Sequence, residues 1–318
     1  MDWIRYSAKV IAAMNQKGGV GKSTAVTLLA EWFSMVRNKR VLIIDLDMQC
    51  NTSDDWVGME DAPNAVGSQI PPLHPDYDPS YGVNERSTIA DIFYGKGVLP
   101  YESWVTEEIG KGGLVDVMLG HPEFLENINN EFSRIDGAID EKVHNRVRAF
   151  LSSPDVQESY DVILLDTGPS RSPVFRAAMR AASSVVIPFT PEEKDVQGIA
   201  AMLQIVRQEN YFRPSGEFEL QLLGLLPNKV RTTNLHKRNL ENVCRGNSDV
   251  FPEECWLPLS TKFPERDDKD ARPKSIFELP KSEKARQAAE AFCLNVERKL
   301  YGNENNHVMT KEKGAIAI

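Results

Sequence analysis

Apolar residues along the chain gather in short continuous runs, which are separated by polar segments and by segments with helical spacing. The runs are rich in Val, Ile and Leu, and most of them lack the alternation of a half-exposed strand. Such runs are typical of parallel strands that are covered on both faces. The runs that predict buried strands are Val10–Met14, Val41–Ile44, Leu114–Met118, Val162–Leu165, Val185–Phe189 and Leu222–Leu226.

Helical spacing of apolar residues marks the segments 26–36, 196–206 and 285–296. Ser282 is a candidate N-cap for the last of these helices, and Pro173 after Ser172 predicts the start of another. The alternation of strands and helices predicts an α/β fold. We expect a doubly wound, mostly parallel sheet with helices on both faces.

Two segments fit neither pattern. Residues 52–84 contain a cluster of prolines and predict a loop-rich surface insertion rather than a separate domain. Residues 302–318 are polar, carry no helical stripe and predict a disordered tail. The rest of the chain, residues 1–301, is expected to form a single domain that carries the insertion.

Composition narrows the class of protein. The chain has 318 residues, of which 41% are apolar and 26% charged, so its core needs no disulfide or metal. The net charge of −9 excludes a wholly basic nucleic-acid coat protein but leaves a local basic patch open. The four cysteines lack the spacing of zinc ligands, which favours a reducing cytoplasm. No apolar run reaches the roughly 20 residues of a membrane span, so no membrane partner is expected.

The strongest chemical signal is a glycine-rich segment between the first predicted strand and the first predicted helix. Its glycines let backbone N–H groups approach phosphate oxygens, and the helix N-terminus adds a partial positive charge. Lys22 would neutralise the β- and γ-phosphates of a nucleotide, and Ser23 would offer a hydroxyl to Mg²⁺. The segment therefore predicts a nucleotide-binding P-loop, which consists of Lys17, Gly18, Gly19, Val20, Gly21, Lys22, Ser23 and Thr24.

The motif differs from the standard P-loop because Gln16 stands at the first glycine position and Lys17 precedes the paired glycines. In this it resembles the deviant-Walker ATPases of the ParA/MinD superfamily, and the resemblance covers residues 10–298. It implies a P-loop NTPase fold, ATP and Mg²⁺ as cofactors, and slow hydrolysis to ADP and phosphate. It also implies an ATP-dependent sandwich homodimer, in which Lys17 reaches the ATP of the partner chain. The alternative is that Lys17 only adds charge to its own loop.

Carboxylates follow two of the predicted strands. Asp45 and Asp47 lie on one side of the pleat at a carboxyl edge, where α/β folds bind ligands. The resemblance gives Asp47 the role of positioning the attacking water, or of a base, and places Asp45 near Mg²⁺. Asp166 ends another strand in the manner of a Walker B motif and is predicted to hold Mg²⁺. A solvated strand end is the alternative for the Asp45–Asp47 pair.

Three positions depart from the family pattern. Met48 replaces a proline, Cys50 replaces a glycine, and Gly168 replaces the first proline after the Walker B aspartate. The departures at Met48 and Gly168 leave open a DNA-binding or scaffold protein that does not hydrolyse ATP. Cys50 is either a redox-sensitive thiol near the nucleotide or an inert small residue. Arg176 and Arg180 share a helix face and could meet a partner chain, DNA or water.

The second half of the chain carries weaker signals. Asn228 and Pro258 resemble the family positions that recognise adenine and sandwich the base, with a turn or cap role as the alternative for Asn228. Residues 228–300 hold 15 basic and 12 acidic residues, so this part of the chain is net basic although the whole chain is net acidic. Basic residues cluster in 229–245 and 272–286, which predicts contacts with DNA phosphates or, equally, a solvated surface of mixed charge.

The resemblance as a whole implies a ParA-type partition ATPase. The ATP dimer would bind double-stranded DNA without sequence preference. A centromere-binding, ParB-like partner would stimulate hydrolysis, and the cycle would position plasmid or chromosomal DNA. We expect a cytoplasmic protein that associates with the nucleoid in its ATP state.

Two alternatives stay open beside the partition ATPase, and a third is set aside by the cysteine spacing. A related ATPase could position a protein cargo such as a chemoreceptor cluster or a microcompartment. A MinD-like membrane ATPase would need a basic amphipathic C-terminal helix. An iron–sulfur reductase would need cysteines that bridge the dimer, and the cysteine spacing does not match one.

Overall fold

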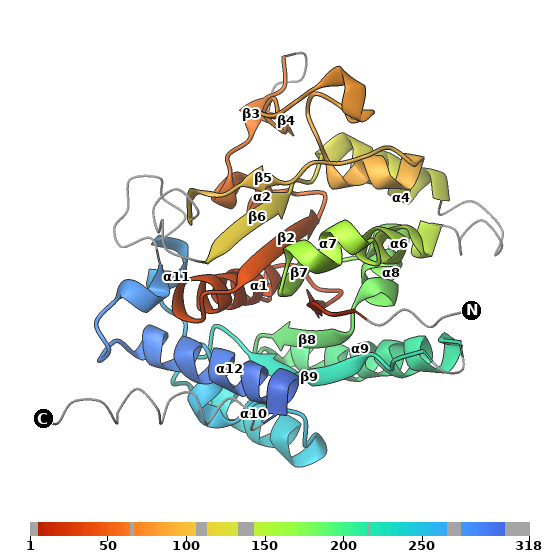
Figure 1. The fold of residues 1–318 in the computed structure, drawn as a ribbon. Coiled ribbons are helices and arrows are strands. Elements are labelled where there is room, and N and C mark those ends of the chain that lie inside the picture. Colours follow the sequence, from red (N-terminus) through yellow and green to blue (C-terminus); the bar gives the residue numbers. More distant parts are fainter. Residues whose placement is uncertain are drawn as a thin grey trace, which may run out of the picture.

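The computed structural model describes residues 6–63, 67–105, 113–132, 143–214, 217–265 and 275–302. Its centre is a seven-stranded sheet with the strand order β5-β6-β2-β7-β1-β8-β9 (Figure 1). The six long strands are mutually parallel, and only the short edge strand β5 runs antiparallel to its neighbour β6. The strand bounds are β1 Lys9–Ala13, β2 Arg40–Leu46, β5 Tyr101–Glu102, β6 Leu114–Met118, β7 Val162–Thr167, β8 Ser184–Phe189 and β9 Gln221–Pro227.

All six predicted strands are present in the sheet, which confirms the doubly wound α/β fold. The described α-helices are α1 Lys22–Glu31, α2 Asn51–Trp56, α4 Pro122–Phe132, α6 Arg146–Leu151, α7 Pro154–Ser159, α8 Pro173–Ala181, α9 Glu193–Phe212, α10 Asn234–Gly246, α11 Lys262–Glu265 and α12 Lys284–Tyr301. A π-helical turn, Trp32–Val36, extends α1, so the first predicted helix is formed along its whole length.

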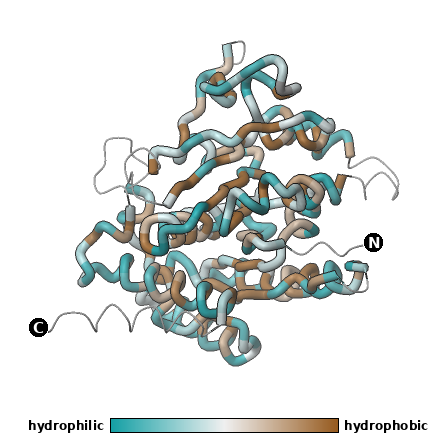
Figure 2. The backbone as a smooth tube through the Cα atoms, viewed as in Figure 1, coloured by the Kyte–Doolittle hydropathy of each residue, from teal (hydrophilic) through white to brown (hydrophobic). Residues whose placement is uncertain are grey.

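The sheet separates two apolar layers. Residues of α1 and α12 pack on one face, and residues of α4, α6, α8 and α9 pack on the other. Along β1, Val10 and Ala12 face the second layer, whereas Ile11 and Ala13 face the first. Because both faces are covered, the strands are apolar without alternation, and hydrophobic residues are prominent along the strands (Figure 2).

One of the two predicted helix starts agrees with the sequence. Helix α8 begins at Pro173 as predicted, and the Ser172 hydroxyl caps it by accepting a hydrogen bond from the N–H of Phe175, 3.2 Å away. The predicted Ser282 cap of α12 is wrong. A turn in which the N–H of Glu283 donates to the carbonyl of Pro280 places Glu283, not Ser282, at the N-cap, and its side chain forms no capping hydrogen bond.

The predicted insertion at residues 52–84 is not a loop from its start. Residues 51–56 form helix α2, in which Thr52, Ser53 and Trp56 are buried. Later residues contribute the small antiparallel pair β3 (Glu60–Asp61) and β4 (Gln69–Ile70) and a single 3₁₀ turn at Pro79–Tyr81. The segment begins as a helix because its first hydroxyls bind buried carboxylates, as described below. The extent of the single domain stays a prediction.

Two further findings bear on the predicted termini and membrane contacts. Gly302 follows the last residue of α12, and the remainder of the predicted tail, residues 303–318, lies outside the described residues. Among the residues that the structure describes, no helix is long and apolar enough to cross a bilayer.

Candidate nucleotide site

Parallel strands bring the predicted P-loop and the predicted acidic residues to one edge of the sheet. The register pairs Ala13 of β1 with Asp166 of β7, and Asp45 of β2 with the same Asp166. The P-loop leaves the carboxyl end of β1 and leads directly into α1. This strand–loop–helix arrangement is the context that the sequence predicts for a phosphate site.

Two glycines give the P-loop its shape. Gly19 and Gly21 have φ angles of 73° and 99°, in the left-handed region that L side chains rarely adopt. A Cβ atom on Gly21 would also lie 1.8 Å from the amide nitrogen of Asn228. Any side chain at position 21 would therefore both strain the loop and displace Asn228.

Lys22 lies inside the loop. Its ammonium nitrogen donates a hydrogen bond to the carbonyl of Lys17 at 3.1 Å, and the residue is 6% exposed. Burial lowers the pKa of Lys22, and the charges of Asp166 and Asp47 act in the opposite direction. Lys22 is thus a buried cation next to the acidic edge, held by a carbonyl that phosphate oxygens could replace.

Helix α2 holds the two buried carboxylates. The Thr52 hydroxyl donates to Asp166 at 2.6 Å, and the backbone N–H and the hydroxyl of Ser53 donate to one oxygen of Asp45 at 2.8 and 2.7 Å. Sequence reasoning missed these two residues because it assigned them to a surface loop. Their position five to eight residues after a strand-end aspartate is the signal that could have revealed them.

Burial raises the proton affinity of both carboxylates. Burial raises the pKa of Asp45 to about 8, and the neighbouring charge of Asp166 adds to this. Burial also raises the pKa of Asp166, against hydrogen bonds from Ser23 and Thr52 that lower it. Two carboxylates in a dry site favour either protons or a cation.

The residues present fit a magnesium ion. Oδ1 of Asp166 is buried without a hydrogen-bond partner among the described residues, and its neighbour Ser23 offers a hydroxyl. Within the described ranges, no group of three or more His, Cys, Asp or Glu side chains could hold a metal by itself. Mg²⁺ commonly takes few protein ligands and completes its shell with phosphates and water. Asp45 is less available as a ligand, because both its oxygens accept hydrogen bonds from the protein.

Asp47 lies at the end of β2 with its carboxylate toward the Walker B strand. One oxygen accepts a hydrogen bond from the N–H of Gln49 at 3.1 Å. A Cβ atom on Gly168 would lie 3.3 Å from the same oxygen, which is a tight contact. The departure at Gly168 therefore gives the Asp47 carboxylate room.

The other two departures are also accommodated in the structure. The Met48 sulfur accepts a hydrogen bond from Asn129 of α4 at 3.3 Å. Cys50 has a φ of 50°, the backbone conformation for which a glycine would be favoured. Its thiol is fully buried and donates to the carbonyl of Asp47 at 3.3 Å. This environment favours the inert interpretation of Cys50.

We expect that only one thiol of the native protein reacts readily. Cys244 is exposed, whereas Cys50, Cys255 and Cys293 are buried, and burial raises the pKa of all three. Brief alkylation at neutral pH, followed by peptide mapping, should modify Cys244 alone, and unfolding should release the other three. Rapid modification of Cys50 in the native protein would restore the redox-sensitive interpretation.

Asn228 and Lys229 lie against the P-loop from the end of β9. The Asn228 amide donates to the carbonyl of Val20 at 2.9 Å, and its oxygen accepts from the N–H of Lys229 at 2.8 Å. The Lys229 ammonium donates to the carbonyl of Gly19 at 2.8 Å, which places this residue of the predicted DNA cluster beside the nucleotide site instead. These contacts favour the turn role of Asn228, and its contact with adenine stays a prediction.

Two other predicted residues take positions near this strand end and on α8. Pro258 forms a parallel bridge with Val230, which lies just after β9 and close in sequence to Asn228. The role of Pro258 at the base stays a prediction. The Arg180 guanidinium pairs with Glu209 of α9 at 2.7 Å and is largely buried. The Arg180 side chain is therefore engaged in an ion pair within its own chain, rather than with DNA, a partner chain or water.

Lys17 is the remaining predicted site residue. Its ammonium forms an ion pair with Asp195 in the first turn of α9, within the same chain. Its reach to a partner's ATP stays a prediction.

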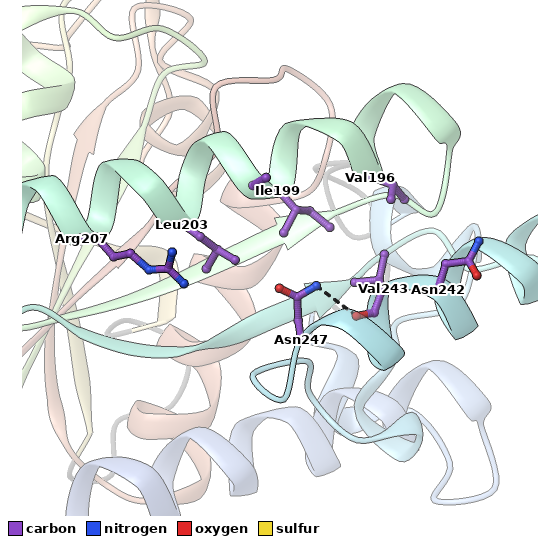
Figure 3. A pocket seen from close by; sticks show the side chains of 8 residues that line it. Val196, Ile199, Leu203, Arg207, Asn242, Val243 and Asn247 are labelled. Carbon is purple, nitrogen blue, oxygen red and sulfur yellow. Dashed lines mark hydrogen bonds between the residues drawn. The ribbon is translucent and has the colours of Figure 1, made fainter.

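A pocket of about 340 Å³ lies between α9 and α10 (Figure 3). Its floor includes Ile199, Leu203 and Val243, and Arg207 and Asn247 lie beside them. The Asn247 amide is occupied by a hydrogen bond to the carbonyl of Val243 at 3.0 Å. None of the residues lining this pocket belongs to the predicted nucleotide site.

Comparisons with known proteins agree with this geometry. A family model described as an AAA domain matches residues 8–212. The chain is 27% identical over 223 residues to the chromosome-partitioning ATPase Soj of Thermus thermophilus, covering 70% of each chain. It is 30% identical over 234 residues to the protein IncC of Escherichia coli, covering 71% of this chain and 52% of IncC. The matched part thus spans about half of IncC.

The fold also has a close likeness among solved structures. McdA from Cyanothece, in a complex with ATP, superposes on this chain with a TM-score of 0.68 at 16% sequence identity. The superposition covers 92% of this chain and 98% of McdA. At this identity the likeness shows a shared fold.

Proposed function

The chain belongs to the ParA/MinD superfamily, to which its AAA domain and its Soj-like relatives assign it, and on this premise we propose that it is a ParA-type partition ATPase. The observation that carries the proposal is the position of Lys17. It lies directly before the phosphate-binding glycines, at the edge where Lys22, Asp47 and Asp166 converge.

ATP binding is the first step of the proposed cycle. The backbone of the loop and the N-terminus of α1 would hold the phosphates, and Lys22 would move from the Lys17 carbonyl to phosphate oxygens. Ser23 and Asp166 would hold Mg²⁺, which neutralises charge on the phosphates. Asn228 would keep the loop in shape through Val20.

Hydrolysis is the second step. Asp47 would orient the attacking water, because its carboxylate lies at the strand end with room provided by Gly168. An aspartate is a weak base, so orientation is its main contribution. We propose that hydrolysis to ADP and phosphate is slow until a centromere-binding, ParB-like partner acts.

Dimerisation connects the nucleotide to the rest of the cycle. Two ATP–Mg complexes that face each other across an interface repel, and Lys17 from each chain would offset that repulsion at the partner's phosphates. The dimer would therefore depend on the γ-phosphate. It would act in the cytoplasm, on double-stranded DNA of the nucleoid.

The structure narrows the proposed DNA contacts. Arg231, Lys237, Arg238 and Arg245 are exposed on or beside α10, and none of them forms an ion pair with another described residue. In the second basic cluster, Arg286 instead pairs with Glu290 at 2.7 Å. Lys281 and Lys284 of that cluster are exposed and form no ion pair among the described residues, so both clusters keep candidates for phosphate contacts, and the α10 residues, which lie on or beside one helix, are tested first.

Charge reversal on α10 tests the DNA-binding step. The double variant Lys237→Glu, Arg238→Glu should weaken ATP-dependent DNA binding roughly tenfold or more, with unchanged basal ATPase activity. The slope of log affinity against log salt should fall by about 0.9 for each lost phosphate contact. Fluorescence anisotropy with ATP, ADP or no nucleotide measures both quantities.

The exposed Arg146 provides a control for this experiment, because Arg146→Glu makes one charge reversal of the same kind on α6. We expect this control to bind DNA like the unmodified chain. Equal DNA binding in all nucleotide states would contradict the proposed function.

A further inference from the structure

The Lys17–Asp195 ion pair joins an accessible cation to a buried anion. The Lys17 side chain is 47% exposed, whereas that of Asp195 is 4% exposed. The Thr190 hydroxyl donates a hydrogen bond to the second carboxylate oxygen of Asp195. Among the described residues, Asp195 forms an ion pair with Lys17 alone.

Local structure favours a carboxylate at position 195. Asp195 lies in the first turn of the 20-residue helix α9, where the helix dipole stabilises negative charge. A buried carboxylate that loses its cation retains only the dipole and the Thr190 hydroxyl, so the loss is costly. The structure thus gives Lys17 a strong partner inside its own chain.

The backbone of Lys17 is fixed to the same region. Its N–H donates to the side-chain oxygen of Asn15 at 3.1 Å, and the Asn15 amide donates to the carbonyl of Pro188 in β8 at 2.8 Å. Both the main chain and the side chain of Lys17 are therefore connected to β8 and the start of α9.

We propose that Asp195 is a positioning residue that restrains Lys17 in the separate protomer and thereby sets the ATP and protein concentrations at which the chains dimerise. The inference rests on the proposed function, in which Lys17 reaches the partner's ATP. One ammonium group cannot serve both carboxylate and phosphate at full strength, so the Asp195 pair competes with the dimer. The Lys17–Asp195 ion pair therefore has to break before the chains can dimerise.

The variant Asp195→Asn tests the competition. It removes the charge and retains the size of the side chain and an oxygen for Thr190. Glu193→Gln is the matched control, because Glu193 lies exposed in the same helical turn. Both changes are made in a chain whose hydrolysis is blocked by Asp47→Ala.

Two measurements test separately whether Asp195 restrains Lys17 and whether this restraint affects dimerisation. Acylation of Lys17 by an amine-reactive ester, followed by mass spectrometry without nucleotide, reports the restraint, with exposed Lys194 as the internal reference. Asp195→Asn should increase Lys17 acylation several-fold, because the ammonium loses its carboxylate. Analytical ultracentrifugation with Mg-ATP should then give a dimer dissociation constant about tenfold lower than that of the control.

Each outcome decides one claim. Unchanged Lys17 acylation would overturn the restraint. If the control dimerises and Asp195→Asn dimerises no more readily, Asp195 does not set the threshold and the inference fails while the proposed function stands. If the control stays monomeric with Mg-ATP, the proposed function fails, and the threshold fails with it. In the triple variant with Lys17→Ala, any gain from Asp195→Asn should disappear.

Discussion

Replacement of Lys22 by alanine is expected to abolish useful ATP binding and to raise the dissociation constant by roughly 100-fold. Lys22 is 6% exposed and its ammonium already lies inside the loop, on the carbonyl of Lys17. The alanine variant would leave the phosphates with backbone N–H groups and no buried cation. Isothermal titration calorimetry with ATP and Mg²⁺ measures the loss.

Two checks make this result specific. The exposed Lys194 offers a control, and Lys194→Ala should bind ATP like the unmodified chain. The thermal unfolding of the Lys22→Ala protein without nucleotide should stay close to that of the control. If the Lys22→Ala variant kept tight ATP affinity, the assignment of the phosphate loop would be wrong.

Replacement of Asp47 by alanine is expected to separate ATP binding from hydrolysis. Turnover should fall about 100-fold or more, because the attacking water loses the group that orients it. ATP affinity should change little, since the hydrogen bond that the Asp47 carboxylate accepts comes from the N–H of Gln49 and not from the phosphate loop. Phosphate release and ATP binding are measured on the same preparation.

A control and a contrary outcome complete the Asp47 test. Asp61→Ala removes an exposed carboxylate on the small β3–β4 pair and should leave turnover unchanged. If Asp47→Ala lost ATP binding together with turnover, Asp47 would hold the site together rather than act on water. The backbone N–H of Asp47, which donates to Asp45 at 3.1 Å, would persist in the variant.

The fold and the phosphate loop could be predicted because their signals are local. Each buried strand is a continuous apolar run, and the loop glycines adopt the positive φ angles for which only glycine is well suited. The carboxylates Asp45 and Asp166 also follow from sequence, since each ends a strand and parallel strands end at one edge. Once the order of the strands is known, the pairing of Asp45 with Asp166 follows from it.

Contacts between distant segments could not be predicted. The sequence predicts a loop at helix α2 because its five polar residues and Trp56 show no apolar stripe, and only the buried carboxylates explain why Thr52 and Ser53 turn inward. The Lys229 contact with Gly19 spans 210 residues of sequence, and it removed one residue from the predicted DNA cluster. The partner of Lys17 in its own chain likewise depends on how α9 begins.

The central claim is that ATP holds two chains face to face, and sedimentation of the Asp47→Ala chain tests it most directly. With saturating Mg-ATP, we expect a species of twice the 35.7 kDa chain mass, and with ADP or after Lys17→Ala we expect single chains. Single chains of the Asp47→Ala protein at every ATP and protein concentration would contradict the account.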